Sequence, residues 1–485
     1  MLDANFKKKT AIGLALAAFV VVFSKMMSLS SQWILGFLLE PNDFGVYGLI
    51  LGGMAFAGAF QSPGLGRLHT QFQSTKGKYW NISIKLSLIF SLIGAFVLVF
   101  ISNTMYKSTQ DLIIMSFIIA CSFPLVGFYS LYSARLEVAK NYKAIATYQL
   151  ISSLVFNCSV VLTAFLGFGA FSFALATLGA AIATASYVLV KRNKQYVNIE
   201  TTELNVDKPS YYSKVKWSLI GAFLLGFSLR SDYFVVGLTL DAYSLGIYYF
   251  GFMLAANIGV VLSQAMTSVL MPAFSSLTKK GGSETYYVNG CRKILLLAII
   301  ICFVAMLCIS PFVSWVWEGK WDEAIPICQL FLITLPLKLL VPVSLSYLES
   351  LGKWKLKAYT LAFDGITVCI ACYLGAFWGL QGAAIAVAIQ RGTAGLASLV
   401  LAHFLAIKKV GNSASLSLLK DILIFCVVVI IGCWLVNSKV SFLVQYSFTS
   451  KLIILFVSYL TFSFVVNRHI YKSLYRTALS LLFKR

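Results

Sequence analysis

Six charged residues stand deep inside long apolar runs of this 485-residue chain, where a charge is costly. A charged side chain at the centre of a membrane-spanning helix costs about 2.5–3.5 kcal/mol, so such residues usually face a polar cavity or a partner. Four of the six are cations and two are acids, which leaves this set net positive. A fixed cation in a medium of low dielectric attracts phosphate strongly, so the pattern favours an anionic ligand. The six are Lys25, Arg230, Asp232, Lys338, Asp364 and Arg391.

Lys25 and Arg230 are the first candidate ligand-binding residues. Segments 38–49 and 239–250 match at an offset of 201, which carries position 25 to 226, one helical turn before Arg230. At 1.5 Å per residue, each cation lies about 20 Å along its apolar run. The alternative is that Arg230 pairs with Asp232, but residues two apart on a helix point to nearly opposite sides. We therefore predict that Lys25 and Arg230 face a central cavity.

The remaining charges in the runs have competing interpretations. Asp232 and Asp364 are the candidate ion-coupling acids. Asp364 and Arg391 lie on neighbouring runs at depths within about 5 Å of each other, which makes them a candidate structural pair. Lys338 stands between two prolines, so it either lines the cavity at a broken helix or extends to the membrane interface.

Composition defines the elements that must position these residues. Hydrophobic residues make up 59% of the chain and charged residues 12%, against about 45–50% and about 25% in soluble proteins. The mean hydropathy of +0.84 and the length of the runs predict an all-α polytopic membrane protein with about 14 transmembrane helices. The predicted runs are 11–39, 44–66, 82–102, 112–134, 145–166, 169–190, 217–238, 245–270, 294–317, 325–348, 358–377, 380–405, 421–437 and 452–467.

Basic residues set the predicted orientation. Of 39 Lys and Arg residues, four lie deep inside runs and four in one set of alternating loops, which leaves 31 in the other set of loops and at the run ends beside them. This asymmetry follows the positive-inside rule and places both termini in the cytoplasm. Because this loop pattern accounts for the basic residues, the net charge of +22 does not call for a nucleic-acid partner, and we predict none. Four basic residues at the inner end of the second run could capture a pyrophosphate at the entrance, although basic residues there are more often topology determinants: Arg67, His69, Lys76 and Lys78.

An internal repeat divides the chain. Besides the match at offset 201, RLEVAKNYK at 135–143 matches YLESLGKWK at 347–355, and GFGAFSFALA at 167–176 matches a segment near 378–387. Three matches in the same order indicate two parallel six-helix repeats, an arrangement that commonly works by rocking one bundle against the other. The predicted domains are an N-lobe at 1–190, a cytoplasmic linker at 191–216, a C-lobe at 217–407, and a C-terminal helix pair with a basic tail at 408–485.

Ordered motifs between about residues 10 and 405 carry a resemblance to a known family. The chain resembles the polysaccharide transporter, or O-antigen flippase, branch of the multidrug/oligosaccharidyl-lipid/polysaccharide flippase superfamily. One departure is the segment PGLGR at 63–67, where the family more often has an acidic residue before the glycine pair. The motifs are LEPNDFGVY at 39–47, RSD at 230–232, LGIY at 245–248, MPAFS at 271–275 and GK at 352–353.

The resemblance implies a flippase, not an enzyme. Its substrate would be a polyprenyl-diphosphate-linked oligosaccharide, such as an O-antigen, capsule or exopolysaccharide unit, moved to the outer leaflet of a bacterial inner membrane. Implied partners are bilayer lipid and, as candidates, a polymerase and chain-length machinery. The cavity residues would be Lys25, Arg230, Lys338 and Arg67.

Two other functions remain open. A multidrug or cation antiporter of the same fold would rely on membrane acids, which the net positive interior disfavours. A membrane polysaccharide polymerase would usually need a large outer loop with catalytic acids, and the outer loops are short. One of these loops carries Trp315, Trp317 and Trp321, predicted as an interfacial aromatic anchor or, alternatively, a sugar-binding patch. Cys369 and Cys372 form a C-x-x-C inside a run, and we expect no metal and no cofactor.

Overall fold

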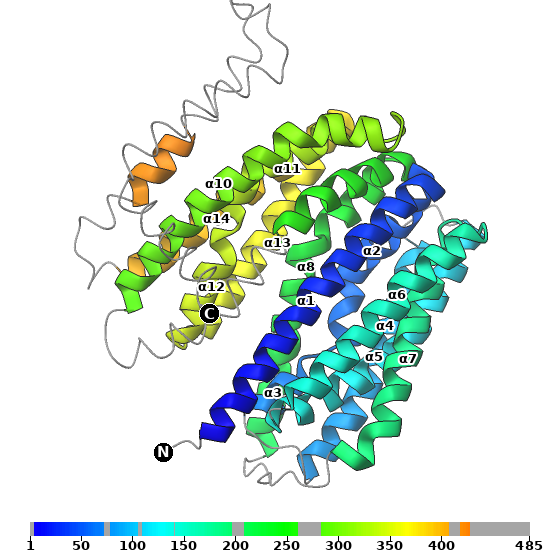
Figure 1. Cartoon of the computed structure of the whole chain (residues 1–485), viewed down its shortest axis with the longest axis vertical. Coiled ribbons are helices and arrows are strands. Elements are labelled where there is room, and N and C mark those ends of the chain that lie inside the picture. Colours follow the sequence, from blue (N-terminus) through cyan, green and yellow to red (C-terminus); the bar gives the residue numbers. More distant parts are fainter. Residues whose placement is uncertain are drawn as a thin grey trace, which may run out of the picture. The chain divides into compact units, whose positions relative to one another are not determined.

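The computed structural model describes residues 4–71, 78–104, 109–139, 141–195, 208–259, 283–406 and 418–426. Within these ranges every regular element is a helix, which confirms the predicted fold class (Figure 1). Two helical segments without labels span 242–259 and 418–426. The labelled helices are α1 (Ala4–Leu38), α2 (Pro41–Gln61), α3 (Leu65–Gln71), α4 (Lys78–Thr104), α5 (Gln110–Val138), α6 (Tyr142–Phe165), α7 (Phe171–Gln195), α8 (Lys208–Thr239), α10 (Ser283–Val316), α11 (Ala324–Lys338), α12 (Leu340–Ser350), α13 (Trp354–Ala376) and α14 (Gly379–Ala406).

Among the described residues, ten segments are long and apolar enough to cross a membrane, with α11 and α12 together forming one of them. They coincide with ten of the predicted runs. Helix α1 covers the run 11–39, and the helix 242–259 begins the run 245–270. Apart from 421–426, the runs 421–437 and 452–467 lie outside the described residues, so those two spans stay a prediction.

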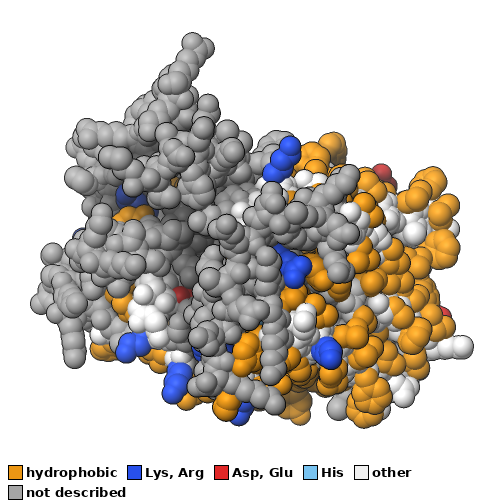
Figure 2. All heavy atoms as spheres, turned by 90° about the horizontal axis from the view of Figure 1, so that it is seen from below, with side chains coloured by type: hydrophobic (Ala, Val, Ile, Leu, Met, Phe, Trp, Pro, Cys, Tyr) orange, Lys and Arg blue, Asp and Glu red, His pale blue; other side chains and the backbone are white. Residues whose placement is uncertain are grey.

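The described surface is rich in apolar side chains, as contact with lipid requires. Phe96 is 70% exposed and Phe117 61%, values that would expose large apolar area to water in a soluble protein. Figure 2 shows hydrophobic side chains spread over the described part of one face, with Lys and Arg at separated positions. The surface therefore suits a bilayer environment.

Equivalent acids begin a helix in each repeat. The Glu40 backbone N–H donates to the Asp43 carboxylate at 3.0 Å, which closes the first turn of α2. In the second repeat, Asp241 is the counterpart of Glu40, and its carboxylate accepts a hydrogen bond from the Ser244 backbone N–H at 3.1 Å. Hydrogen bonds from Ser244 lower the pKa of Asp241 below its usual value. Both helices thus begin with a carboxylate that satisfies otherwise unpaired backbone donors.

The two repeats cross where these helices begin. A Cβ at Gly45 would lie 1.7 Å from the Ala242 carbonyl oxygen, and a Cβ at Gly246 would lie 1.8 Å from the Pro41 carbonyl oxygen. These contacts are reciprocal at the predicted offset, because 45 + 201 = 246 and 41 + 201 = 242. Only residues without a side chain allow backbones to approach this closely. The crossing therefore has local two-fold symmetry, as the repeat predicts.

Contacts divide the chain into two compact units. One contains Met1–Phe250 and Ala358–Val387, and the other contains Gly251–Lys357 and Ala388–Arg485. In the first unit the most extensive helix pairings are α2 with α8, α6 with α7, and α4 with α5. The predicted division into lobes at 1–190 and 217–407 follows the repeat and stays a prediction.

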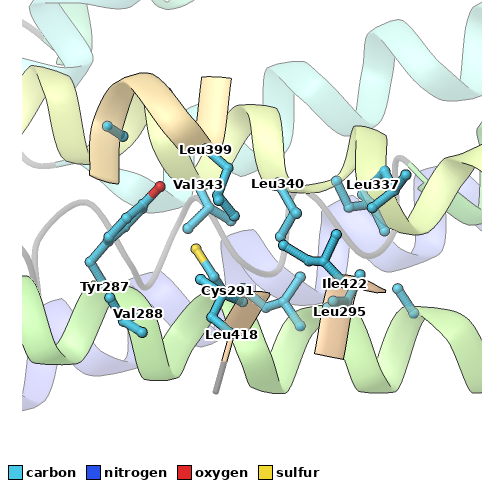
Figure 3. Close-up of a cluster of buried hydrophobic side chains, with 14 of the residues drawn as sticks. Tyr287, Val288, Cys291, Leu295, Leu337, Leu340, Val343, Leu399, Leu418 and Ile422 are labelled. Carbon is cyan, nitrogen blue, oxygen red and sulfur yellow. The ribbon is translucent and has the colours of Figure 1, made fainter. Parts of the chain in front are cut away.

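The second unit has its own hydrophobic cluster, in which the segment 418–426 packs with α10, α12 and α14 (Figure 3). Leu418 and Ile422 lie in this cluster together with Leu295. Beside the cluster, Arg292 Nε donates to Asp421 Oδ2 at 2.7 Å, and the Asp421 side chain is 1% exposed. Burial of this ion pair fixes the start of the predicted thirteenth span against α10.

Candidate functional site

Arg230 is the predicted cation whose surroundings the structure defines most fully. It lies on α8 and is partly buried, and its Nη1 would lie 3.6 Å from a Cβ placed at Gly58 of α2. No carboxylate in the described ranges lies within 4 Å of the guanidinium. Arg230 therefore keeps its charge available to an anion.

Asp232 has different neighbours, although it lies only two residues further along α8. It is fully buried, and its Oδ2 accepts a hydrogen bond from the Tyr248 hydroxyl at 3.1 Å. The Cys372 thiol donates to the Asp232 backbone oxygen at 3.7 Å. Asp232 and Arg230 form no ion pair, because residues two apart on a helix point to different sides.

The second candidate coupling acid lies near the same face of α8. Asp364 on α13 is buried, and its Oδ2 accepts a hydrogen bond from the Ser228 hydroxyl. Ser228 and Asp232 are four residues apart, so they are neighbours on one side of α8. Arg391 is buried on the part of α14 that belongs to the other compact unit. Its predicted pairing with Asp364 stays a prediction.

The other three candidate cavity cations come from three different helices, α1, α3 and α11. Lys25 is partly buried on α1, and no carboxylate of the described chain lies within 4 Å of it. Lys338 is the last residue of α11, at a break before α12, as expected for a broken helix. A Cβ at Gly395 would lie 2.1 Å from the Leu337 carbonyl oxygen, so α14 passes close to this break. The Arg67 side chain lies outside the described residues.

At the predicted inner end, His69 is not a surface residue, contrary to the expectation of an anion entrance there. It is 1% exposed, and its Nε2 is 2.6 Å from Ser83 Oγ. Ser83 is in turn hydrogen-bonded to the Tyr211 hydroxyl, and the Arg135 guanidinium lies 4.4 Å from the centre of the Trp80 ring. Hydropathy did not predict this network, because it cannot distinguish a buried histidine from an exposed one.

The tryptophan loop is also mainly structural. Trp317 is 3% exposed and Trp321 fully buried, whereas Trp315 is 82% exposed. Glu318 and Gly319 adopt positive φ angles of 51° and 85°, which turn the chain tightly between the two buried rings. Only Trp315 therefore fits the predicted interfacial anchor. Two buried rings do not form a sugar-binding patch.

Charged residues at the repeat-related inner positions have local partners. Glu137 accepts a hydrogen bond from the Thr70 hydroxyl at 2.9 Å, and Glu349 forms an ion pair with Lys357. In the part of the chain that the structure covers, no three His, Cys, Asp or Glu side chains gather in a way that could hold a metal ion. Glu137 and Glu349 are thus engaged with neighbouring side chains of the protein.

Comparisons with known proteins define the class. The family described as "Polysaccharide biosynthesis protein" matches residues 34–326, which is more than half of the chain. The chain therefore belongs to this polysaccharide biosynthesis family, and the match confirms the resemblance to polysaccharide flippases. A search of curated protein sequences gives no match.

Solved structures show the same fold. The lipid II flippase MurJ, in an inward closed conformation, is similar with a TM-score of 0.67 and 14% identity over 94% of this chain and 99% of that one. A multidrug resistance MATE family transporter in an inward-facing conformation gives 0.58 and 12%, over 81% and 98%. A MOP superfamily transporter from Pyrococcus furiosus, described as having a binding pocket of reverse polarity, gives 0.52 and 14%, over 83% and 95%. Family and fold agree with the prediction of a transport protein rather than an enzyme.

Proposed function

We propose that the chain is a flippase that moves a polyprenyl-diphosphate-linked oligosaccharide from the inner to the outer leaflet by alternating access. The cargo would be an O-antigen, capsule or exopolysaccharide repeat unit, and the membrane a bacterial inner membrane with both termini of the chain in the cytoplasm. The polysaccharide biosynthesis family supports the class of cargo, and the similarity to MurJ supports a fold able to carry a flippase.

The observation that carries the proposal is the environment of Arg230. This cation is partly buried within a membrane-spanning helix and has no carboxylate within 4 Å among the described residues. A charge without a counter-ion in a membrane span raises the free energy of the protein, so we expect an anionic ligand that offsets this cost. A diphosphate does so, because it offers several anionic acceptors to a guanidinium. Lys25, in the same compact unit, is proposed as a further cargo-binding cation, and Lys338 stays a predicted one.

Substitution of Arg230 tests the proposal. Arg230→Ala should reduce surface polysaccharide about 10–150-fold, since a hydrogen bond to a charged group contributes about 1.5–3 kcal/mol. Arg230→Lys should retain part of the activity, and Arg230→Glu should be worse than Ala because it also repels the cargo. The assay is restoration of surface polysaccharide in a strain that lacks the gene, with membrane levels measured in parallel.

A matched control separates function from structure. Lys85 is an exposed cation on α4, and Lys85→Ala should leave polysaccharide unchanged. A purely structural role of Arg230 predicts low protein levels for Arg230→Ala and rescue by Asp232→Asn. We expect no such rescue, because Asp232 is bonded to Tyr248 and not to Arg230. Normal polysaccharide in Arg230→Ala would refute the cationic cavity and favour the antiporter alternative.

Ion coupling is proposed for Asp232 and Asp364. Both carboxylates are buried in the first unit and lie near one side of α8, where a proton or sodium ion would alter their hydrogen bonds. A polysaccharide polymerase and chain-length machinery are proposed partners on the strength of the family alone.

A further inference from the structure

A hydrophobic cluster of the first unit has a counterpart in the second. In the first unit, α4, α5, α7 and α8 contribute Trp80, Leu131, Val188, Tyr211 and Val215. In the second, α10, α12, α14 and the helix 418–426 contribute Tyr287, Val343, Leu399, Leu418 and Ile422 (Figure 3). In that order, the offsets between the two sets are 207, 212, 211, 207 and 207. The values 212 and 211 are those of the sequence matches that begin at 135 and 167, so the two clusters follow the repeat.

The aromatic residue near the start of α4 and its counterpart on α10 have equivalent partners. The Trp80 ring lies edge to face with an α5 ring, with centroids 5.8 Å apart, and 4.4 Å from an α5 guanidinium. The Tyr287 hydroxyl is 3.0 Å from an α12 serine hydroxyl, and its ring stacks on an α12 ring at 4.5 Å. An offset of 212 relates the two pairs of partners: Tyr132 and Arg135 in the first unit, Ser344 and Tyr347 in the second.

The helix 418–426 lies on the second unit as the start of α8 lies on the first. Helix α8 follows α7 in the chain, and 418–426 follows α14, the counterpart of α7. Each helix buries two residues one turn apart in its cluster, at an offset of 207. The position after the first buried residue is exposed in both helices, 40% for Tyr212 and 44% for Leu419. The same face of each helix therefore packs on the preceding repeat.

A hydrogen bond fixes the start of α8 on the first unit. The Tyr211 hydroxyl and Ser83 Oγ on α4 are 2.5 Å apart. The offset of 207 replaces these two residues by Leu418 and Gly290, whose side chains carry no polar atom. The helix 418–426 therefore needs a different polar contact.

That contact is an ion pair. Arg292 Nε on α10 donates to Asp421 Oδ2 at 2.7 Å, and the Asp421 side chain is 1% exposed. Removing one partner of a buried pair leaves an uncompensated charge, so the pair favours the docked position strongly. The equivalent positions of the first unit hold two lysines, Lys85 and Lys214. The docking is thus common to both units, whereas the polar contact that fixes it is particular to each.

Stacked repeats leave a docking surface on the last member, which a terminal element has to cover. We infer that the helix 418–426 begins a third, partial repeat, which covers the docking surface of the second repeat as α8 covers that of the first. This terminal element stays bound to α10 during transport and moves with the second unit. The inference goes beyond the proposed function, because it gives a role to a segment outside the two six-helix repeats.

Paired cysteines in the full chain test the equivalence of the two helices. On a cysteine-free background, Lys85→Cys with Lys214→Cys should react with a short bifunctional maleimide as efficiently as Arg292→Cys with Asp421→Cys. A protease site inserted between 195 and 208, or between 406 and 418, allows cleavage of the chain, and only cross-linked fragments then stay together on a gel.

Matched controls move one cysteine of each pair by a single residue. Leu86→Cys takes the place of Lys85→Cys, and Lys293→Cys that of Arg292→Cys, which turns the thiol by about 100° around the helix. Both control pairs should cross-link less than their parent pairs. A first-unit pair that reacts no better than its control, while the second-unit pair cross-links, would overturn the equivalence.

Transport by the cross-linked protein tests whether the terminal element moves with the second unit. The chain with Arg292→Cys and Asp421→Cys would be reconstituted in vesicles, and the movement of a labelled polyprenyl-diphosphate oligosaccharide between leaflets would be measured. Cross-linked protein should transport at the same rate as the same variant treated with a monofunctional maleimide. Loss of transport in the cross-linked protein alone would show that the helix must leave α10, and would overturn this role.

The two experiments separate the inference from the proposed function. Cross-linking does not depend on the cargo, so it decides the third repeat even if the unlinked protein moves no lipid, a result that would contradict the flippase proposal. Transport that is lost only on cross-linking leaves the flippase proposal standing and overturns the inferred role of the helix.

Discussion

The reciprocal glycine crossing predicts a graded response to added methyl groups. A Cβ at Gly45 would lie 1.7 Å from a carbonyl oxygen, whereas ordinary contact begins at 3.4 Å. The two backbones would have to separate by about 1.7 Å, the difference of these distances. Overpacking of this kind costs about 1–3 kcal/mol, which corresponds to about 5–150-fold in a conformational equilibrium. Gly45→Ala should therefore open the end of the bundle that carries Glu40 and Asp241, which the charge asymmetry places outside.

Cysteine labelling from outside would measure this opening. A cysteine at Gly58 fits, because a Cβ there meets only Arg230 Nη1 within 4 Å. On a cysteine-free background, Gly45→Ala should increase labelling of this site by an impermeant maleimide at least five-fold and reduce transport. Gly246→Ala should act alike, since its Cβ would meet the Pro41 carbonyl oxygen at 1.8 Å.

Two other glycines serve as controls, for which the added methyl group should have a smaller effect or none. A Cβ at Gly48 would lie 2.9 Å from the flexible Leu245 side chain, so Gly48→Ala should have a smaller effect. At Gly179 the nearest atom would be Ser159 Oγ at 3.9 Å, and Gly179→Ala should have none. Labelling that is unchanged in Gly45→Ala, or equal in all three variants at equal protein levels, would refute the view that the crossing closes this end.

Four other predictions follow from single contacts. Asp421→Ala should destabilise the protein by about 3–5 kcal/mol, because it leaves Arg292 without its buried partner; thermal unfolding in detergent measures this, and a change below about 1 kcal/mol would contradict it. Hydrogen bonding lowers the pKa of Asp241 in the folded protein. Its contribution to stability should therefore be complete above pH 3.8, the pKa in the unfolded chain, and be lost as the pH falls through the lower pKa of the folded state. Asp241→Asn should abolish that part of the acid dependence. Asp232→Asn keeps an acceptor for Tyr248 and should reduce ion-dependent transport without lowering protein levels; full ion dependence in Asp232→Asn and in matching Asp364, Glu137 and Glu349 variants would exclude these acids as coupling sites. Single cysteines at Lys320 and Lys439 should react with an impermeant reagent, and those at Lys194 and Lys280 should not; outside labelling at 194 would overturn both the span count and the repeat.

The sequence predicted the features of the fold that a membrane environment requires. Apolar runs must be helical in a bilayer because every backbone polar group needs a partner, so ten described spans fall where hydropathy placed them. The offset of 201 was also readable, since Gly45 and Gly246 must both lack a side chain for their backbones to meet. The break at Lys338 followed from the flanking prolines.

Side-chain partners were harder to predict, because in a membrane span the lipid-facing and protein-facing sides are both apolar. Hydropathy alone could not distinguish exposed Trp315 from buried Trp317 and Trp321. It also could not show that His69 joins Ser83 in the interior.

Helix α8 joins the proposed cargo and coupling sites through a broken symmetry. Tyr47 and Tyr248 are equivalent at the offset of 201, yet Tyr47 stacks on Phe173 whereas Tyr248 donates to Asp232. Both tyrosines are close in sequence to a glycine of the crossing, Gly45 or Gly246. A change at Asp232 would therefore act through Tyr248 on the same crossing that Tyr47 borders from the other repeat. Because Arg230 and Asp232 are only two residues apart on α8, a movement of this helix would displace both residues and would so link the proposed cargo and coupling sites.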